Sequence, residues 1–303
     1  MKMPKLFPHG GVVVPMVTPF TSDGELDDVA VRRIIDRLAA CQLGIFILGT
    51  TGEAASTSPA LRRRFVQLAV EHAAGRVLVY AGIGDNCVAT SIAAGYEYLH
   101  LGVDAVVALL PSYYVLEPPE MQAYFEYLAA NVPGPLIIYN IPQTTRMTIP
   151  VEVVESLARI PNIIGLKDSD GTPGRIESVA RRLADRPDFT LYLGVAAQAA
   201  AALRLGFTGI VPSSGNLVQE WWRDLMDHAR AGRWGEVETL QERLNAAAAV
   251  FQTGRTLGQS LAALKLAMHL RGYCNPDVLP PLLPVSGAGC ESIRALLEQL
   301  KLP

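Results

Sequence analysis

The sequence predicts an α/β fold, a (β/α)8 TIM barrel with a C-terminal helical extension. Short apolar, β-branched runs alternate with helical patterns, which is typical of βαβ units around a parallel sheet. The alternation supplies eight strands, the number that closes such a barrel. Residues 213–303 then show further helical patterns, and this stretch is longer than the single helix that would close the barrel.

The predicted strands are apolar at nearly every position, as strands covered on both faces are. They span residues 11–17, 44–48, 77–81, 105–109, 136–139, 163–167, 191–194 and 209–212. The alternative is an open doubly wound sheet, which would show a glycine-rich turn after its first strand. Val17-Thr-Pro-Phe20 stands there instead, without a G-x-G-x-x-G motif.

Helical patterns fill the segments between the strands. Apolar residues at 31, 34, 35 and 38 share one face of a helix over 27–41. Ser58 and Pro59 supply an N-cap and a first-turn proline for the next helix, which runs to about residue 72. Further barrel helices are expected at 88–101, 119–131, 150–158, 173–184 and 196–205.

After the eighth strand, helices are expected at 218–231, 234–251, 260–270 and 286–300, and the first of them closes the barrel. We therefore expect two domains. Residues 1–231 form the catalytic barrel, and residues 232–303 form a C-terminal helical domain that helps to build an oligomer.

Composition excludes several classes of protein. Half of the 303 residues are hydrophobic, so a large core can be buried, and the net charge of −3 offers no basic field for nucleic acid. The four cysteines form no C-x-x-C pair and read as free thiols of a reducing compartment. No segment has the apolar run of a signal peptide or a membrane span. We expect a cytoplasmic protein that binds neither nucleic acid nor membrane.

Lys167 is the most informative residue. The chain has 26 Lys and Arg together but only five lysines, and Lys167 is the only lysine between Lys5 and Lys265. It ends the apolar run of a predicted buried strand, where desolvation lowers the pKa of an amine. A neutral lysine attacks a carbonyl, which arginine cannot do. Lys167 is therefore a candidate Schiff-base nucleophile; the alternative is a strand-end lysine that pairs with Asp168 or Asp170.

Other candidate groups also follow predicted strands, where a barrel of this type has its active site. Gly49-Thr-Thr-Gly-Glu53 follows the second strand, and its backbone N–H groups and hydroxyls suit a carboxylate or phosphate, although a plain helix-entry turn is the alternative. Tyr113 and Tyr114 follow the fourth strand, and Tyr139 ends the fifth. These tyrosines are either proton carriers or packing and interface residues.

Together, an amine nucleophile, a phenol and an anion-binding turn are the parts needed to handle a 2-oxo acid through an imine. No cluster of Asp and Glu accompanies them that would hold a metal. The sequence therefore predicts an imine-forming mechanism without a metal or another cofactor.

The chain strongly resembles the family of dihydrodipicolinate synthase and N-acetylneuraminate lyase, the pyruvate-dependent class I aldolases. The resemblance rests on separate motifs in the expected order along almost the whole chain. They are Gly11-Val-Val-Val-Pro-Met-Val-Thr-Pro-Phe20, Gly49-Thr-Thr-Gly-Glu53, Tyr139-Asn-Ile-Pro142, Gly165-Leu-Lys167 and Pro281-Leu-Leu-Pro284. The resemblance implies a (β/α)8 barrel with a helical C-terminal domain, assembled as a homotetramer built from two tight dimers.

The resemblance also implies roles for individual residues. Lys167 matches the imine-forming lysine, and Tyr139 matches the tyrosine that moves protons to and from the imine and substrate. Thr50 and Thr51 match the pair that binds the pyruvyl carboxylate, beside Gly49, and Thr51 also belongs to the proton relay. Tyr113, or alternatively Tyr114, is similar to the tyrosine that a neighbouring subunit inserts to complete this relay.

Gly194 and Val211 match positions that line the pocket, Val211 through its backbone carbonyl.

One position departs from the family pattern. Dihydrodipicolinate synthases proper have an arginine five residues after the motif tyrosine, where it binds the carboxylate of aspartate semialdehyde, and this chain has Thr144 there. A neutral hydroxyl cannot replace a bidentate guanidinium, and Arg146 lies two positions later.

We therefore expect a carbon–carbon lyase that cleaves or forms a bond between pyruvate and an aldehyde. Its substrate in the cleavage direction is a 2-oxo-3-deoxy acid. A 2-oxo-3-deoxy-acid dehydratase and dihydrodipicolinate synthase proper are the enzymatic alternatives. A regulatory or binding protein on the same barrel is the non-enzymatic alternative, but it would be marked by loss of the lysine or the tyrosine.

Overall fold

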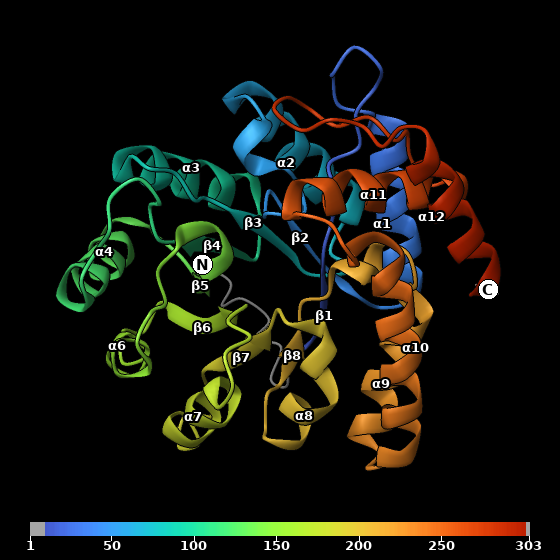
Figure 1. Ribbon diagram of the computed structural model, residues 1–303. Helices are drawn as coiled ribbons and strands as arrows, with labels where there is room; N and C mark the ends of the chain where they lie inside the picture. Colours follow the sequence, from blue (N-terminus) through green and yellow to red (C-terminus); the bar gives the residue numbers. More distant parts are fainter. Residues whose placement is uncertain (1–9, 301–303) are drawn as a thin grey trace. The chain divides into compact units, whose positions relative to one another are not determined.

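The computed structural model describes residues 10–300, and its eight strands close into a barrel in chain order (Figure 1). The predicted fold class is confirmed. The strands are β1 Gly11–Pro15, β2 Gly44–Ile47, β3 Val79–Gly82, β4 Ala105–Leu109, β5 Leu136–Asn140, β6 Ile163–Asp168, β7 Thr190–Leu193 and β8 Gly209–Ile210. Every residue of β2 and of β5 is buried, which explains why their sequences are apolar throughout.

The chain divides into two compact units. The first unit comprises the residues up to Val13 together with Tyr80–Pro212, and the second comprises Val14–Val79 together with the residues from Ser213 onward. The predicted domain boundary between residues 231 and 232 stays a prediction.

The first unit is built from parallel strands and the helices between them. The strands from β3 to β8 pair in sequence order, and β8 pairs with β1 through Gly11 and Gly209. In Figure 1 the longer helices of this unit flank the outer side of its strands. The helices are α3 Val88–Leu101, α4 Pro118–Asn131, α5 Pro142–Thr145, α6 Val151–Leu157, α7 Arg175–Arg182 and α8 Ala199–Arg204, with a 3-10 turn at Ala196–Gln198.

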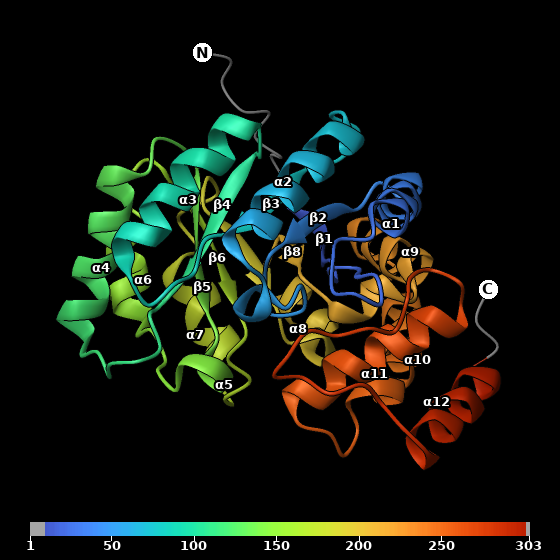
Figure 2. The same cartoon turned by 90° about the horizontal axis from the view of Figure 1, so that it is seen from above.

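The second unit holds β2 and a set of helices with clear local start signals. The Asp27 side chain accepts from the backbone N–H of Ala30 and begins α1, and Ser58 with Pro59 begins α2 as the sequence predicts. Helix α10 packs against α9, α11 and α12. Figure 2 shows α10, α11 and α12 side by side. The elements are α1 Asp28–Ala40, α2 Pro59–Ala73, α9 Gln219–Arg230, α10 Trp234–Gln252, α11 Leu257–Leu270 and α12 Ala288–Gln299, with 3-10 turns at Ala54–Ser56 and Ser213–Asn216.

Several segments differ from the sequence-based prediction. Strand β8 has two residues, whereas the apolar run predicted four. Helix α7 begins at Arg175 because the preceding Gly174 takes a left-handed conformation (φ 82°), which ends the loop that contains Pro173. The single helix predicted at 196–205 is a 3-10 turn followed by α8, and the one-turn helix α5 was not predicted because it is too short to show a periodic apolar face.

Candidate active site

Lys167 and Tyr139 lie side by side on neighbouring strands of the first unit. They are partners in the parallel register of β5 and β6, and both are buried, with 5% and 4% of their surface exposed. The Lys167 Nζ atom lies 3.7 Å from the centroid of the Tyr139 ring. The structure thus brings together the two residues that the sequence singled out as nucleophile and proton carrier.

Burial sets the protonation of this amine. Desolvation lowers the pKa of Lys167 below that of an ordinary lysine, and the adjacent Tyr139 side chain acts in the opposite direction. The neutral amine is therefore present at a lower pH than for an exposed lysine. A nucleophilic lysine needs this property.

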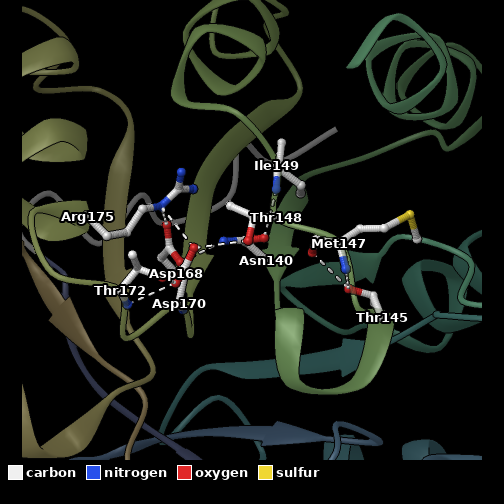
Figure 3. Close-up of polar contacts among 9 residues, drawn as sticks. All are labelled: Asn140, Thr145, Met147, Thr148, Ile149, Asp168, Asp170, Thr172 and Arg175. Atoms are coloured by element: carbon white, nitrogen blue, oxygen red, sulfur yellow. Dashed lines mark hydrogen bonds and ion pairs between the residues drawn. The ribbon is translucent and has the colours of Figure 1, made fainter. Parts of the chain in front are cut away.

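Asn140 and Asp168, the next residues on the same two strands, form a buried polar network with Arg175 of α7 (Figure 3). The Asn140 amide donates to Asp168 Oδ1 at 2.9 Å, and Arg175 Nε donates to Asp168 Oδ2 at 2.8 Å. The alternative role for Lys167 was an ion pair with Asp168 or Asp170. In the structure the Asp168 carboxylate is bound by Arg175, and the Asp170 carboxylate accepts hydrogen bonds from Thr148 and Thr172. Asn140 and Arg175 were missed in the sequence; Asn140 directly follows the candidate tyrosine, which was the available signal.

The segment after β5 carries the second-substrate position. Thr144 is half-buried in α5, and its hydroxyl donates to the Ile141 carbonyl at 3.3 Å. Arg146 is exposed and has a left-handed backbone (φ 59°) at the C-cap of α5. Thr145 between them is buried, and its hydroxyl lies 3.1 Å from the Ile141 carbonyl and 3.0 Å from the Met147 carbonyl.

Gly194 and Val211 lie directly after β7 and β8. The Gly194 N–H donates to the Asp168 carbonyl at 2.6 Å, and a Cβ atom on Gly194 would come within 2.0 Å of Ser169 Oγ. The position therefore has no room for a side chain. Val211 is buried, and its N–H donates to the Leu193 carbonyl at 2.8 Å.

Tyr113 and Tyr114 extend into solvent after β4. Their exposed fractions are 77% and 70%, and their rings meet edge to face with centroids 5.1 Å apart. The Asn86 side chain supports this loop because it accepts from the backbone N–H groups of Ser112 and Tyr113 at 2.8 and 3.1 Å. Aromatic side chains with this exposure, on a fixed loop, are available to a partner molecule.

The Gly49–Glu53 turn belongs to the second unit and follows β2. Thr51 is buried and Thr50 is half-buried. A Cβ atom on Gly49 would lie 2.7 Å from the Phe46 ring, so only glycine fits. The hydroxyl of Thr18 donates to the Gly52 carbonyl at 2.5 Å.

Glu53 anchors the end of this turn. It has a left-handed backbone (φ 53°), and its Oε1 atom lies 2.5 Å from Lys265 Nζ of α11. Its Oε2 atom accepts from the Leu279 N–H at 3.1 Å, and Lys265 Nζ also donates to the Asp277 carbonyl at 2.7 Å. Burial lowers the pKa of Lys265, and Glu53 acts against this shift. The pair ties the threonine turn to the helices of the second unit.

Two further properties describe residues 10–300. No three His, Cys, Asp or Glu side chains gather there closely enough to ligate a metal ion. None of the helices in that range combines the length and the hydropathy needed to cross a bilayer.

The model of the dihydrodipicolinate synthetase family matches residues 8–300 of the chain. The chain belongs to this family. It is an enzyme of the aldolase-type carbon–carbon lyases, as its relatives named as synthases are. The resemblance seen in the sequence motifs is confirmed.

Members of the family are similar over nearly their full length. The 4-hydroxy-tetrahydrodipicolinate synthase of Halorhodospira halophila is 33% identical over 297 residues, which cover 96% of this chain and 97% of the relative. A dihydrodipicolinate synthase structure from Bacteroides thetaiotaomicron superposes with a TM-score of 0.91 at 31% identity, over 96% of this chain and 99% of the other. YagE, an Escherichia coli K12 prophage protein of the family solved in complex with pyruvate, gives a TM-score of 0.89 at 27% identity, over 97% and 99%.

Proposed function

We propose that this enzyme is a Schiff-base-forming class I aldolase that cleaves or forms a carbon–carbon bond between pyruvate and an aldehyde. One observation carries the proposal: a buried lysine with a lowered pKa lies 3.7 Å from the ring of a buried tyrosine at the carboxyl ends of two barrel strands. Active sites of (β/α)8 barrels lie at these ends. The pyruvate complex of YagE supports the choice of substrate.

The reaction begins at the Lys167 amine. The neutral Nζ attacks C2 of the 2-oxo acid, and loss of water gives a protonated imine that accepts electrons from the bond to be cleaved. In the cleavage direction, Tyr139 takes the proton of the C4 hydroxyl while its own phenolic proton passes along the relay. The C3–C4 bond breaks, an aldehyde leaves, and the electron pair forms an enamine. Protonation at C3 and hydrolysis release pyruvate and restore the amine.

The remaining roles follow the family resemblance. We propose that Thr50, Thr51 and the backbone beside Gly49 bind the carboxylate, and that Thr51 also carries protons. Tyr113 of a neighbouring subunit completes the relay in a homotetramer, with Tyr114 as the alternative. Gly194 and the backbone carbonyl of Val211 line the pocket. The enzyme acts in the cytoplasm.

The second substrate distinguishes this chain from the synthases that it resembles. Thr144 presents a neutral hydroxyl that donates to the Ile141 carbonyl, so it cannot clamp a carboxylate as a guanidinium does. A 2-oxo-3-deoxy acid is therefore the proposed substrate in the cleavage direction. The names of the relatives favour a second candidate, condensation of pyruvate with aspartate semialdehyde.

One screen separates these candidates. The enzyme is incubated with a panel of 2-oxo-3-deoxy acids, and the release of pyruvate is followed; pyruvate with aspartate semialdehyde is run in parallel. We expect pyruvate release from at least one acid and its loss in Lys167→Ala. Loss of water with the carbon chain intact would identify a dehydratase, and turnover only with aspartate semialdehyde would identify the synthase.

A further inference from the structure

The two strands that carry Tyr139 and Lys167 are tied together one residue further on. In the parallel register, Tyr139 is the partner of Lys167 and Asn140 is the partner of Asp168. Consecutive side chains of a strand point to opposite faces. The reacting pair therefore shares one face, and Asn140 and Asp168 share the other.

Asn140 contacts both the neighbouring strand β6 and the segment that follows α5. Its Nδ2 atom donates to Asp168 Oδ1 at 2.9 Å, and its Oδ1 atom accepts from the Ile149 N–H at 3.1 Å. Asn140 and Asp168 have 1% and 0% of their surface exposed. Water therefore does not compete for these bonds, and they fix the relative position of the two strand ends (Figure 3).

Asp168 is in turn fixed by Arg175. Arg175 Nε donates to Asp168 Oδ2 at 2.8 Å, and the Asp170 N–H donates to Asp168 Oδ1 at 2.9 Å. Only 8% of the Arg175 side chain is exposed, and its Nη2 atom is buried without a hydrogen-bond partner among the described residues. Arg175 is the first residue of α7, so the ion pair joins the end of β6 to this helix.

A buried ion pair of this kind is weak evidence for stability, because desolvation of the two charges offsets their attraction. Apolar residues of similar volume would pack here at less cost. The position of the network, one residue from both the amine and the phenol, indicates what it provides instead. It holds a geometry that hydrophobic packing alone does not specify.

We propose that Asn140, Asp168 and Arg175 are positioning residues that keep Lys167 and Tyr139 in the alignment needed for imine chemistry. The inference rests on the proposed function. It adds three residues that act through the reacting pair rather than on the substrate.

The experiment uses pyruvate as the probe. The full-length enzyme is mixed with pyruvate for different times and quenched with borohydride, and the fraction of reduced adduct on Lys167 is measured by mass spectrometry. The saturating rate constant and the half-saturating pyruvate concentration are compared for wild type, Asp168→Asn, Arg175→Met and Arg175→Lys. Melting temperatures are recorded for each variant.

We expect Asp168→Asn and Arg175→Met to lower the saturating rate constant by roughly tenfold to a hundredfold, because small misplacements of reacting groups have effects of this size. The half-saturating concentration should change by less than about threefold. Arg175→Lys should recover most of the rate, because the bond to Asp168 uses one N–H rather than a guanidinium fork.

Two matched controls test whether any loss of a similar contact has this effect. Arg182 lies on α7, as Arg175 does, and pairs with Glu152 and Glu155. Asn162 immediately precedes β6 and donates to the Ala129 carbonyl. Arg182→Met and Asn162→Ala should leave the rate constant within about twofold of wild type, because neither contact adjoins the reacting pair.

Melting temperatures that fall while the rate constant stays at the wild-type value would overturn the proposal, since the network would then be only structural. If Arg175→Met does not fold, Asp168→Asn decides the question, because it removes one charge and almost no volume. Failure of the proposed function is seen separately, as a wild-type enzyme that forms no pyruvate adduct at Lys167.

Discussion

At the scale of single residues, the proposed chemistry depends on where one lysine is buried. Lys167 has 5% of its surface exposed, and desolvation is the largest influence on its amine. Arginine stays protonated at any accessible pH, whereas a buried lysine loses its proton readily. A lysine at this position, in a chain with five lysines and 21 arginines, therefore suits the proposed imine chemistry.

The lowered pKa of Lys167 predicts how imine formation depends on pH. A lowered pKa means that the neutral, reactive amine predominates at a pH below the ordinary lysine value of 10.5. The rate of pyruvate adduct formation should rise with pH through this lowered pKa and level off below pH 10.5. A rate still rising at that pH would show that Lys167 titrates as an exposed lysine.

Removal of the Tyr139 hydroxyl tests the proton carrier. Tyr139→Phe keeps the buried ring but loses the acid and base group, so turnover should fall by roughly a hundredfold or more. Tyr124→Phe is the control, because it removes a hydroxyl that donates to the Leu109 carbonyl from another tyrosine of the same unit. Equal turnover in the two variants would exclude Tyr139 from the mechanism.

The sequence singled out the proposed reacting pair but not the residues that support it. Lys167 stood out because a lysine is costly to bury, and Tyr139 stood out because it ends a predicted strand, where the active site of a barrel lies. Arg175 is seven residues from Asp168, and nothing local indicates that they meet, because the intervening loop decides it. The same holds for Lys265 and Glu53, which are far apart in the chain.

At the scale of elements, the Gly49–Glu53 turn is fixed by a buried ion pair. The side chains of Lys265 and Glu53 have 1% and 0% of their surface exposed. Lys265→Met should lower the free energy of unfolding by about 3–5 kcal/mol, because it leaves the Glu53 carboxylate buried without its partner. Chemical denaturation of the purified enzyme measures this change.

Two further variants complete this test. The double variant Lys265→Met/Glu53→Gln removes both charges and should be less destabilised than Lys265→Met alone. Arg230→Met breaks an exposed pair with Asp227 in the same unit and should cost less than about 1 kcal/mol. A Lys265→Met variant as stable as Arg230→Met would show that the buried pair does not hold the turn.

Some element boundaries followed from the sequence, as at α3 Val88–Leu101, which was predicted to the residue and ends at the left-handed Gly102 (φ 104°). Other predicted boundaries were wrong because the backbone conformation of a single residue sets where the helix begins, as Gly174 does for α7. The two-residue strand β8 shows the same limit, because an apolar run does not reveal where strand pairing stops.

At the scale of the whole molecule, the count and order of strands predicted the closed barrel. The division into two units could not be predicted, because it depends on contacts between distant segments, such as the pairing of Gly11 with Gly209. The assembly of subunits is a proposal from the family resemblance. In this proposal, the exposed Tyr113 is the residue through which assembly affects catalysis.

Mixed oligomers test this shared site. Lys167→Ala lacks the nucleophile and Tyr113→Phe lacks the hydroxyl proposed to act in the neighbouring subunit. When the two variants are co-expressed and purified through two different tags, a Lys167 site should receive an intact Tyr113 from the other chain. Activity per intact Lys167 should then exceed that of Tyr113→Phe alone. Activity no higher than that of the Tyr113→Phe homo-oligomer would exclude donation of Tyr113 by the neighbouring subunit.

The central claim is that the Lys167 amine forms a covalent imine with pyruvate. The most direct measurement is peptide mass spectrometry of enzyme treated with pyruvate and borohydride, beside Lys167→Ala and Lys265→Ala. The account predicts one reduced pyruvyl group on the peptide that contains Lys167 and none in Lys167→Ala, with the label retained in folded Lys265→Ala. An unlabelled Lys167 in active enzyme, or full turnover by Lys167→Ala, would contradict it.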